Sequence, residues 1–131
     1  MVTDTISDLI IRLKNASSVG KKTFVVDSSK LNLSILEVLK KEGYISELTK
    51  KNKKNIKFIE AEIAYGEEGK SKLSGVKRVS KPSMRLYRKA KEIRKIKQGY
   101  GLLIISTPKG ILTGAEAKRE NVGGEPLFEI W

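Results

Sequence analysis

The sequence predicts an α+β protein of two small subdomains, residues 1–65 and residues 66–131. In the first half, two amphipathic helical segments alternate with short β-branched runs, whereas the second half consists mostly of strand-like runs. Residues 66–69 (Gly-Glu-Glu-Gly) lie between them and have the glycine-rich, charged composition that is typical of domain boundaries. We therefore expect a helix–strand–helix–strand–strand order in the N-terminal half and a β-rich C-terminal half with one short helix.

Two segments of the N-terminal half have the apolar spacing of helices. The first covers residues 4–17, and the second begins after an N-cap at Ser28 or Ser29. Gly43 follows the second helix where a left-handed C-cap is expected. Runs rich in β-branched and aromatic residues predict strands. These strands lie at residues 23–26, 44–48 and 56–64, and a lysine-rich hairpin joins the last two.

The C-terminal half is expected to form a sheet with one helix. Strands are predicted at residues 73–79, 102–105 and 125–131, with an extended piece at residues 84–87. Thr113 and Glu116 have the spacing of a capping box, which predicts a short helix ending near Glu120. Residues 89–96 could form another short helix, although little of that segment would be buried.

The composition narrows the functional classes. The 131 residues carry 27 Lys and Arg against 15 Asp and Glu, and this net charge of +12 favours a polyanionic partner such as nucleic acid. The chain contains neither cysteine nor histidine, which removes disulfides, thiol nucleophiles and the usual zinc ligands. No apolar run approaches the roughly 18 residues of a membrane span. We therefore expect no cofactor, no metal site and no membrane partner, and an enzyme is disfavoured.

The positive charge is concentrated in two segments. Residues 70–97 hold twelve basic residues against a single acidic one, Glu92. A smaller cluster surrounds the expected hairpin and consists of Lys50, Lys51, Lys53, Lys54 and Lys57. Either segment can be an ordinary solvated face. We interpret the larger one as a source of affinity for phosphates, which leaves selectivity to another part of the chain.

Residues 106–110 (Ser-Thr-Pro-Lys-Gly) follow the expected buried strand and form the main candidate for that selectivity. Hydroxyl groups can donate to and accept from base edges and ribose hydroxyls, and a lysine suits a phosphate. An ordinary polar turn explains the same residues equally well. Ser106 and Lys109 also match the Ser-x-x-Lys pair of acylating hydrolases, but Pro108 and Gly110 disfavour the helix that this motif requires.

Two further groups could belong to a binding site. Residues 123–125 (Gly-Gly-Glu) would allow a ligand or another backbone to approach closely, although a plain helix-to-strand turn has the same composition. A carboxylate repels phosphate, so Glu125 would act by holding loop groups in place. Tyr87 lies between Arg85 and Arg88 and could stack on an unpaired base, or it could be a half-buried tyrosine of the sheet.

Several motifs, in the correct order, resemble small-subunit ribosomal protein eight, the universal S8 family of bacterial type. The motifs are residues 2–9, 12–16, 29–31, 39–45, 78–82 with Arg85 and Tyr87, 106–107, 109–110, 113, 116–117 and 123–125. The likeness covers essentially the whole chain. It implies a two-domain α+β protein, monomeric off the ribosome, that acts in the cytoplasm as part of the small ribosomal subunit.

The resemblance also implies the partners and the contact residues. The expected partner is the central domain of 16S-type rRNA, at its irregular helix twenty-one, together with neighbouring small-subunit proteins and the chain's own operon mRNA. The implied RNA contacts are Thr3, Asp4, Lys30, Tyr87, Ser106, Thr107, Lys109, Gly124 and Glu125. A generic basic RNA chaperone is the alternative function.

Pro108 departs from the family pattern, which usually has serine at this position. The change removes one hydroxyl and one backbone N–H from the proposed reading segment. Loss of a polar base contact would weaken discrimination by about 1–3 kcal/mol. Alternatively, the proline ring makes the segment more rigid and offsets part of that loss.

Overall fold

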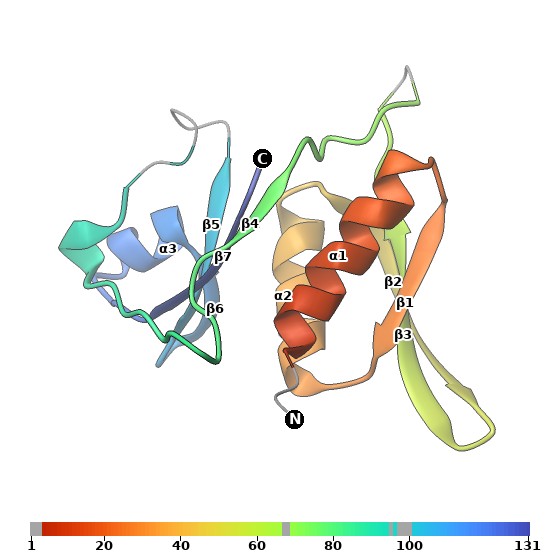
Figure 1. The fold of residues 1–131 in the computed structure, drawn as a ribbon, viewed down its shortest axis with the longest axis horizontal. Coiled ribbons are helices and arrows are strands. Elements are labelled where there is room, and N and C mark those ends of the chain that lie inside the picture. The colour runs from red at the N-terminus through yellow and green to blue at the C-terminus, as the bar shows by residue number, and fades with distance from the viewer. Residues whose placement is uncertain (1–3, 67–68, 95, 97–100) are drawn as a thin grey trace. The chain divides into compact units, whose positions relative to one another are not determined.

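The computed structural model describes residues 4–66, 69–94, 96 and 101–131. The chain forms two compact units, one of residues Thr5–Leu73 and the other of Ser74–Trp131 together with Asp4. Each unit contains an antiparallel sheet with helices packed against it (Figure 1). The predicted α+β class is confirmed. Within the described residues, no helix is long and apolar enough to span a membrane.

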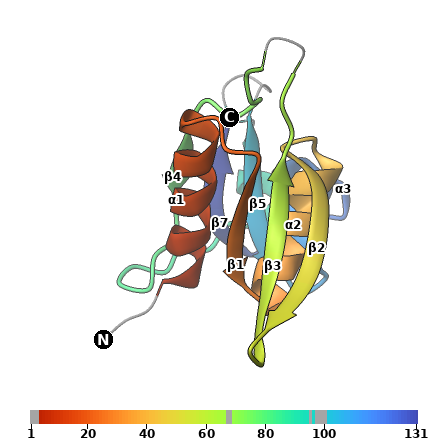
Figure 2. The ribbon, with the colours of Figure 1, turned by 90° about the vertical axis from the view of Figure 1, so that its right-hand side faces the viewer.

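The unit Thr5–Leu73 has a three-stranded sheet in the order β1-β3-β2. The strands are β1 (Thr23–Asp27), β2 (Ile45–Lys53) and β3 (Ile56–Ile63). Helices α1 (Thr5–Ser18) and α2 (Lys30–Lys41) pack against this sheet, as Figures 1 and 2 show. Apolar side chains from the two helices and the sheet form the core of the unit: Leu9, Leu13, Ile35, Leu36, Leu39, Ile45, Ile59 and Ala61.

Both predicted helices of this unit are confirmed, and local chemistry explains the ends of α2. The Ser29 side chain accepts a hydrogen bond from the Asn32 backbone N–H at 3.1 Å, which caps the first turn. Gly43 follows the helix with φ of +90°, a conformation that glycine adopts without steric cost.

The hairpin between β2 and β3 differs from the prediction. The ladder continues as far as the pair Lys53 and Ile56, so most of the predicted lysine loop lies in strands. The turn itself is only Lys54 and Asn55, both with positive φ (53° and 66°). Two central residues of this conformation match the twist of the flanking strands, which explains why the ladder can extend to the turn.

The other unit contains a four-stranded sheet in the order β4-β7-β5-β6. The strands are β4 (Val76–Arg78), β5 (Leu102–Thr107), β6 (Gly110–Thr113) and β7 (Glu125–Ile130). Helix α3 (Gly114–Arg119) packs against β5 and β6. Ile93, Leu103, Ile105 and Ala117 form a buried apolar cluster on this side of the sheet.

The capping box before α3 is confirmed, because the Thr113 hydroxyl accepts from the Glu116 N–H and the Glu116 carboxylate accepts from the Thr113 N–H.

Three elements of this unit differ from the prediction. Strand β6 was not predicted, since four residues directly after a turn give little periodicity. Among the described residues of segment 89–96, which was considered for another helix, the 3₁₀ turn Ala90–Glu92 is the only helical element. Residues 85–87 do not belong to a strand.

Candidate nucleic-acid interface

The candidate site lies where β5 ends and β7 begins, in the unit Ser74–Trp131. Ser106 and Thr107 are the last two residues of β5 rather than part of a loop. Ser106 pairs with Glu125 across the ladder, so these two residues are direct neighbours on adjacent strands. We call this region, with Tyr87, Gly123 and Gly124, the strand-end site.

The Glu125 carboxylate connects three segments of the chain. It accepts a hydrogen bond from the Ser80 hydroxyl at 2.5 Å and another from Arg85 Nη1 at 3.1 Å. Ser80 is fully buried, and its oxygen also accepts from the Leu86 backbone N–H at 3.0 Å. Because hydrogen bonds to an ionised oxygen are strong, this carboxylate holds the segment before Tyr87 against the start of β7. Glu125 is thus paired within the protein and does not present a free negative charge.

Two glycines allow the backbones of the site to meet. The N–H of Gly124 donates to the carbonyl of Arg88 at 2.9 Å, and the N–H of Arg88 donates to the carbonyl of Gly124 at 2.8 Å. A Cβ atom at Gly124 would lie 1.9 Å from the Ser106 carbonyl oxygen, and one at Gly123 would lie 2.4 Å from the Arg88 carbonyl oxygen. No side chain fits at either position without movement of the backbone.

Tyr87 is 64% exposed although the backbone beside it is fixed on both sides. The next residue, Arg88, forms an isolated antiparallel bridge with Gly124. The Tyr87 hydroxyl lies close to Gly123, since it would be 3.2 Å from a Cβ atom at that position. An exposed ring at a fixed position can stack on a base with little loss of conformational freedom.

The Thr107 hydroxyl stabilises the turn that follows it. It donates to the Gly110 carbonyl at 2.8 Å and accepts from the Lys109 backbone N–H at 3.1 Å. Pro108 occupies the first turn position, which suits the fixed φ of its ring. Only one lone pair of the Thr107 oxygen therefore remains for a ligand.

Ser106 is the better placed hydroxyl for an external contact. Within the described part of the chain, no hydrogen-bond partner is found for its side chain, which is partly exposed. Lys109 Nζ pairs with Glu120 Oε2 at 3.1 Å, and both side chains are about half exposed. Such a pair is weak, so a phosphate can compete for the lysine.

The model of the family described as "Ribosomal protein S8" matches residues 4–131. The chain belongs to the ribosomal protein S8 family. It is 43% identical over 131 residues to "Small ribosomal subunit protein uS8" of Helicobacter pylori and to that of Helicobacter acinonychis, with full coverage of both chains in each case. It is 41% identical over 130 residues to the protein of that name from Corynebacterium jeikeium, covering 99% of this chain and 98% of the relative.

As a member of the ribosomal protein S8 family, the chain is a structural ribosomal protein and not an enzyme. The strand-end site agrees with this conclusion. Ser106 lies in a strand, and the Lys109 ammonium pairs with Glu120 rather than with the Ser106 hydroxyl.

Two of the implied contact residues, Asp4 and Lys30, lie outside the strand-end site. Thr3 falls outside the described residues. Asp4 accepts hydrogen bonds from Arg78 at 3.1 and 3.2 Å, and this largely buried pair joins it to β4. Lys30 is the exposed first residue of α2, in the other unit.

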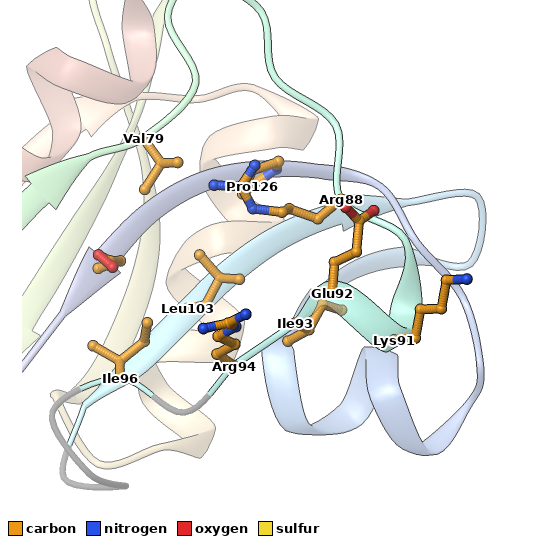
Figure 3. Close-up of a pocket in the computed structure, with 10 residues that line it drawn as sticks. Val79, Arg88, Lys91, Glu92, Ile93, Arg94, Ile96, Leu103 and Pro126 are labelled. Carbon is orange, nitrogen blue, oxygen red and sulfur yellow. The ribbon is translucent and has the colours of Figure 1, made fainter.

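A hollow of about 590 Å³ lies next to the strand-end site, between the sheet and the segment that follows Tyr87 (Figure 3). Its apolar lining includes Val79, Leu103 and Pro126, and its basic lining consists of Arg88, Lys91 and Arg94. Arg88 is shared with the strand-end site through its bridge to Gly124. Glu92 and Glu129 also line the hollow, so its charge is mixed.

Sequence reasoning missed Ser80 as part of the site. The 78–82 motif contains Ser80, but its partner Glu125 is 45 residues away and no periodicity connects them. A fully buried serine cannot be distinguished from a surface serine by residue type alone. The Gly-Gly-Glu sequence of residues 123–125 and the family resemblance drew attention to Glu125, but neither of them indicated Ser80.

Proposed function

We propose that this chain is a structural constituent of the small ribosomal subunit that binds directly to the central domain of 16S-type rRNA and supports subunit assembly. Its site on the RNA is the irregular helix twenty-one, and mimicry of that site lets the protein repress translation of its own operon mRNA. Neighbouring small-subunit proteins contact its other surfaces, and it is a monomer before assembly. The names of its relatives support the assignment to the small subunit.

The strand-end site in residues 66–131 is the proposed reader of the RNA. The observation that carries this proposal is that the backbone at Ser106, and the backbone next to Tyr87, are both held in place near Gly124. Both neighbouring backbones are held by hydrogen bonds, so the two side chains need little ordering when a ligand binds. A hydroxyl and an exposed ring are suited to ribose hydroxyls and unpaired bases, which irregular RNA helices present.

Affinity comes from the basic residues around this site. Arg85 and Arg88 flank Tyr87, and Lys109 follows the two hydroxyls in the adjacent turn. Each cation that neutralises a phosphate releases condensed counterions. The neutral hydroxyl and ring contacts release few counterions. Affinity should therefore fall with rising salt concentration more steeply than selectivity does.

Binding to a central-domain rRNA stem is therefore expected to depend steeply on salt. The logarithm of the association constant should fall linearly with the logarithm of salt concentration, with a slope of about 0.7–0.9 per phosphate neutralised. Fluorescence anisotropy titrations between ~0.05 and ~0.3 M salt measure this slope. A total slope below about 2 would contradict the proposal that lysine and arginine contacts supply the affinity.

A further inference from the structure

The hairpin between β2 and β3 forms a two-stranded ribbon that extends beyond the third strand of its sheet. β1 stops pairing with β3 at Phe58, whereas β2 and β3 continue to pair as far as Lys53 and Ile56. Figures 1 and 2 show the hairpin projecting past the end of β1. Residues 49–57 are all exposed. We call residues 50–57 the lysine ribbon.

The lysine ribbon carries positive charge on both of its faces. Lys51 and Lys53 are two residues apart on β2, so their side chains share one face. Lys50 lies on the opposite face, and the register of the two strands places Lys57 on that face as well. Lys54 occupies the turn at the tip. A flat partner could engage only one of these faces at a time.

Most of this charge is uncompensated. Lys51 pairs with Glu60, with 2.9 Å between Nζ and Oε2. For Lys50, Lys53, Lys54 and Lys57, no carboxylate lies within ion-pair distance in the part of the chain that the structure describes. Like charges this close repel one another, so the ribbon gains most from a partner that brings several negative charges together.

The tip of the ribbon is also costly to form. Lys54 has φ of 53°, in the left-handed region that glycine or asparagine occupies more readily than lysine. Its neighbour Asn55 (φ 66°) is of the type that tolerates this conformation. A lysine at this position places a charge at the outermost point of the hairpin despite an unfavourable backbone, which points to a role for the charge itself.

We propose that the lysine ribbon enters a groove of RNA and neutralises phosphates on both sides of it. A groove presents two rows of phosphates that face each other, which matches a ribbon with lysines on both faces. Lysine binds phosphate as a point charge and reads no base, so this contact adds affinity without selectivity. The inference rests on the proposed rRNA-binding function and adds a second contact, in the unit Thr5–Leu73, to the strand-end site.

The triple variant Lys53→Gln/Lys54→Gln/Lys57→Gln tests this proposal. Its binding to a central-domain rRNA fragment that extends beyond the selective stem should show a salt slope smaller by about 2–3 than wild type. At ~0.15 M salt this corresponds to a loss of affinity on the order of 100-fold. The matched control is Lys14→Gln/Lys21→Gln/Lys22→Gln, which removes the same charge from exposed positions of the same unit.

A site-directed probe identifies the contact directly. The chain has no cysteine, so Ile56→Cys and Val19→Cys each provide one attachment point for a hydroxyl-radical source, at side chains that are 64% and 70% exposed. From Ile56→Cys we expect cleavage of the RNA at two strand segments that face each other across a groove. Val19 lies between α1 and β1, and β1 begins at Thr23, which pairs with Glu62 at the end of β3 away from the hairpin. Val19→Cys should therefore not cleave those segments.

Three outcomes separate this inference from the proposed function. If wild type prefers the central-domain RNA but both triple variants lose equal affinity, the lysine ribbon is not an RNA contact, and an acidic protein becomes its better partner. The inference is also overturned if Ile56→Cys gives no cleavage within a complex that forms normally. If wild type shows no preference for the central-domain RNA, the proposed function itself is wrong.

Discussion

Gly124→Ala is expected to destabilise the protein by about 3 kcal/mol and to reduce its preference for central-domain RNA by about 100-fold or more. The new methyl group would lie 1.9 Å from the Ser106 carbonyl oxygen. The backbone must therefore move where β5 meets β7, and overpacking of this kind costs about 1–3 kcal/mol or more. Because Ser106 is displaced as well, the loss of RNA selectivity should accompany the loss of stability. Urea unfolding, followed by RNA titration below the unfolding transition, measures both effects.

Gly66→Ala is the matched control for this substitution. Gly66 does not have positive φ, and a Cβ there would meet only the Lys70 carbonyl oxygen at 3.6 Å, an ordinary contact. Removing a glycine at such a position stabilises a protein by up to about 1 kcal/mol through the unfolded chain. Equal stability and equal RNA preference in Gly124→Ala and wild type would show that the close approach of β5 and β7 is not required.

Glu125→Ala is expected to cost about 2–3 kcal/mol of stability and to lower RNA selectivity, although it removes a negative charge. The Ser80 hydroxyl is buried and donates to this carboxylate, so the variant leaves a buried donor without an acceptor. The bond from Arg85 contributes less, because the Arg85 side chain is 70% exposed. Without Glu125 the segment before Tyr87 loses its anchor to β7. Chemical denaturation and competitive RNA binding measure the two effects.

Glu129→Ala separates this positioning role from simple electrostatics. Glu129 lies on the same strand, and the substitution changes the charge by the same amount. A purely electrostatic effect predicts that both variants bind every RNA slightly more tightly than wild type. The positioning role predicts that Glu125→Ala alone loses preference for the cognate RNA, and that Glu125→Gln, which retains an acceptor for Ser80, recovers part of it. Identical behaviour of the two alanine variants would rule out the positioning role.

The elements that local chemistry specifies could be predicted from the sequence. Ser29 and Gly43 bound α2, and Thr113 with Glu116 starts α3, because each of these signals acts within four residues of the element it limits. The ladder beyond Leu48 could not be predicted in this way. Lysine and asparagine have low strand propensity. The hydrogen-bonded pairing with β3 nevertheless extends β2 to Lys53.

Only part of the candidate site could likewise be predicted from the sequence. The family resemblance implied Ser106, Gly124 and Glu125 as contacts, whereas their residue types alone also fit ordinary turns. The bond between Ser80 and Glu125 was not visible, since it joins residues that only the folded sheet brings together. The turn role of the Thr107 hydroxyl was also hidden, because a free hydroxyl and one that closes a turn have the same sequence.

Competitive binding is the most direct test of the claim that the strand-end site reads RNA. Wild type and Ser106→Ala would each be titrated with a central-domain rRNA stem and with a scrambled stem of equal length in ~0.15 M salt. We predict that wild type prefers the cognate stem by about 10³-fold or more. Loss of the Ser106 contact, worth about 1–3 kcal/mol, should reduce that preference by roughly 5- to 150-fold without changing affinity for the scrambled stem. Equal binding of the two stems by wild type would contradict the account.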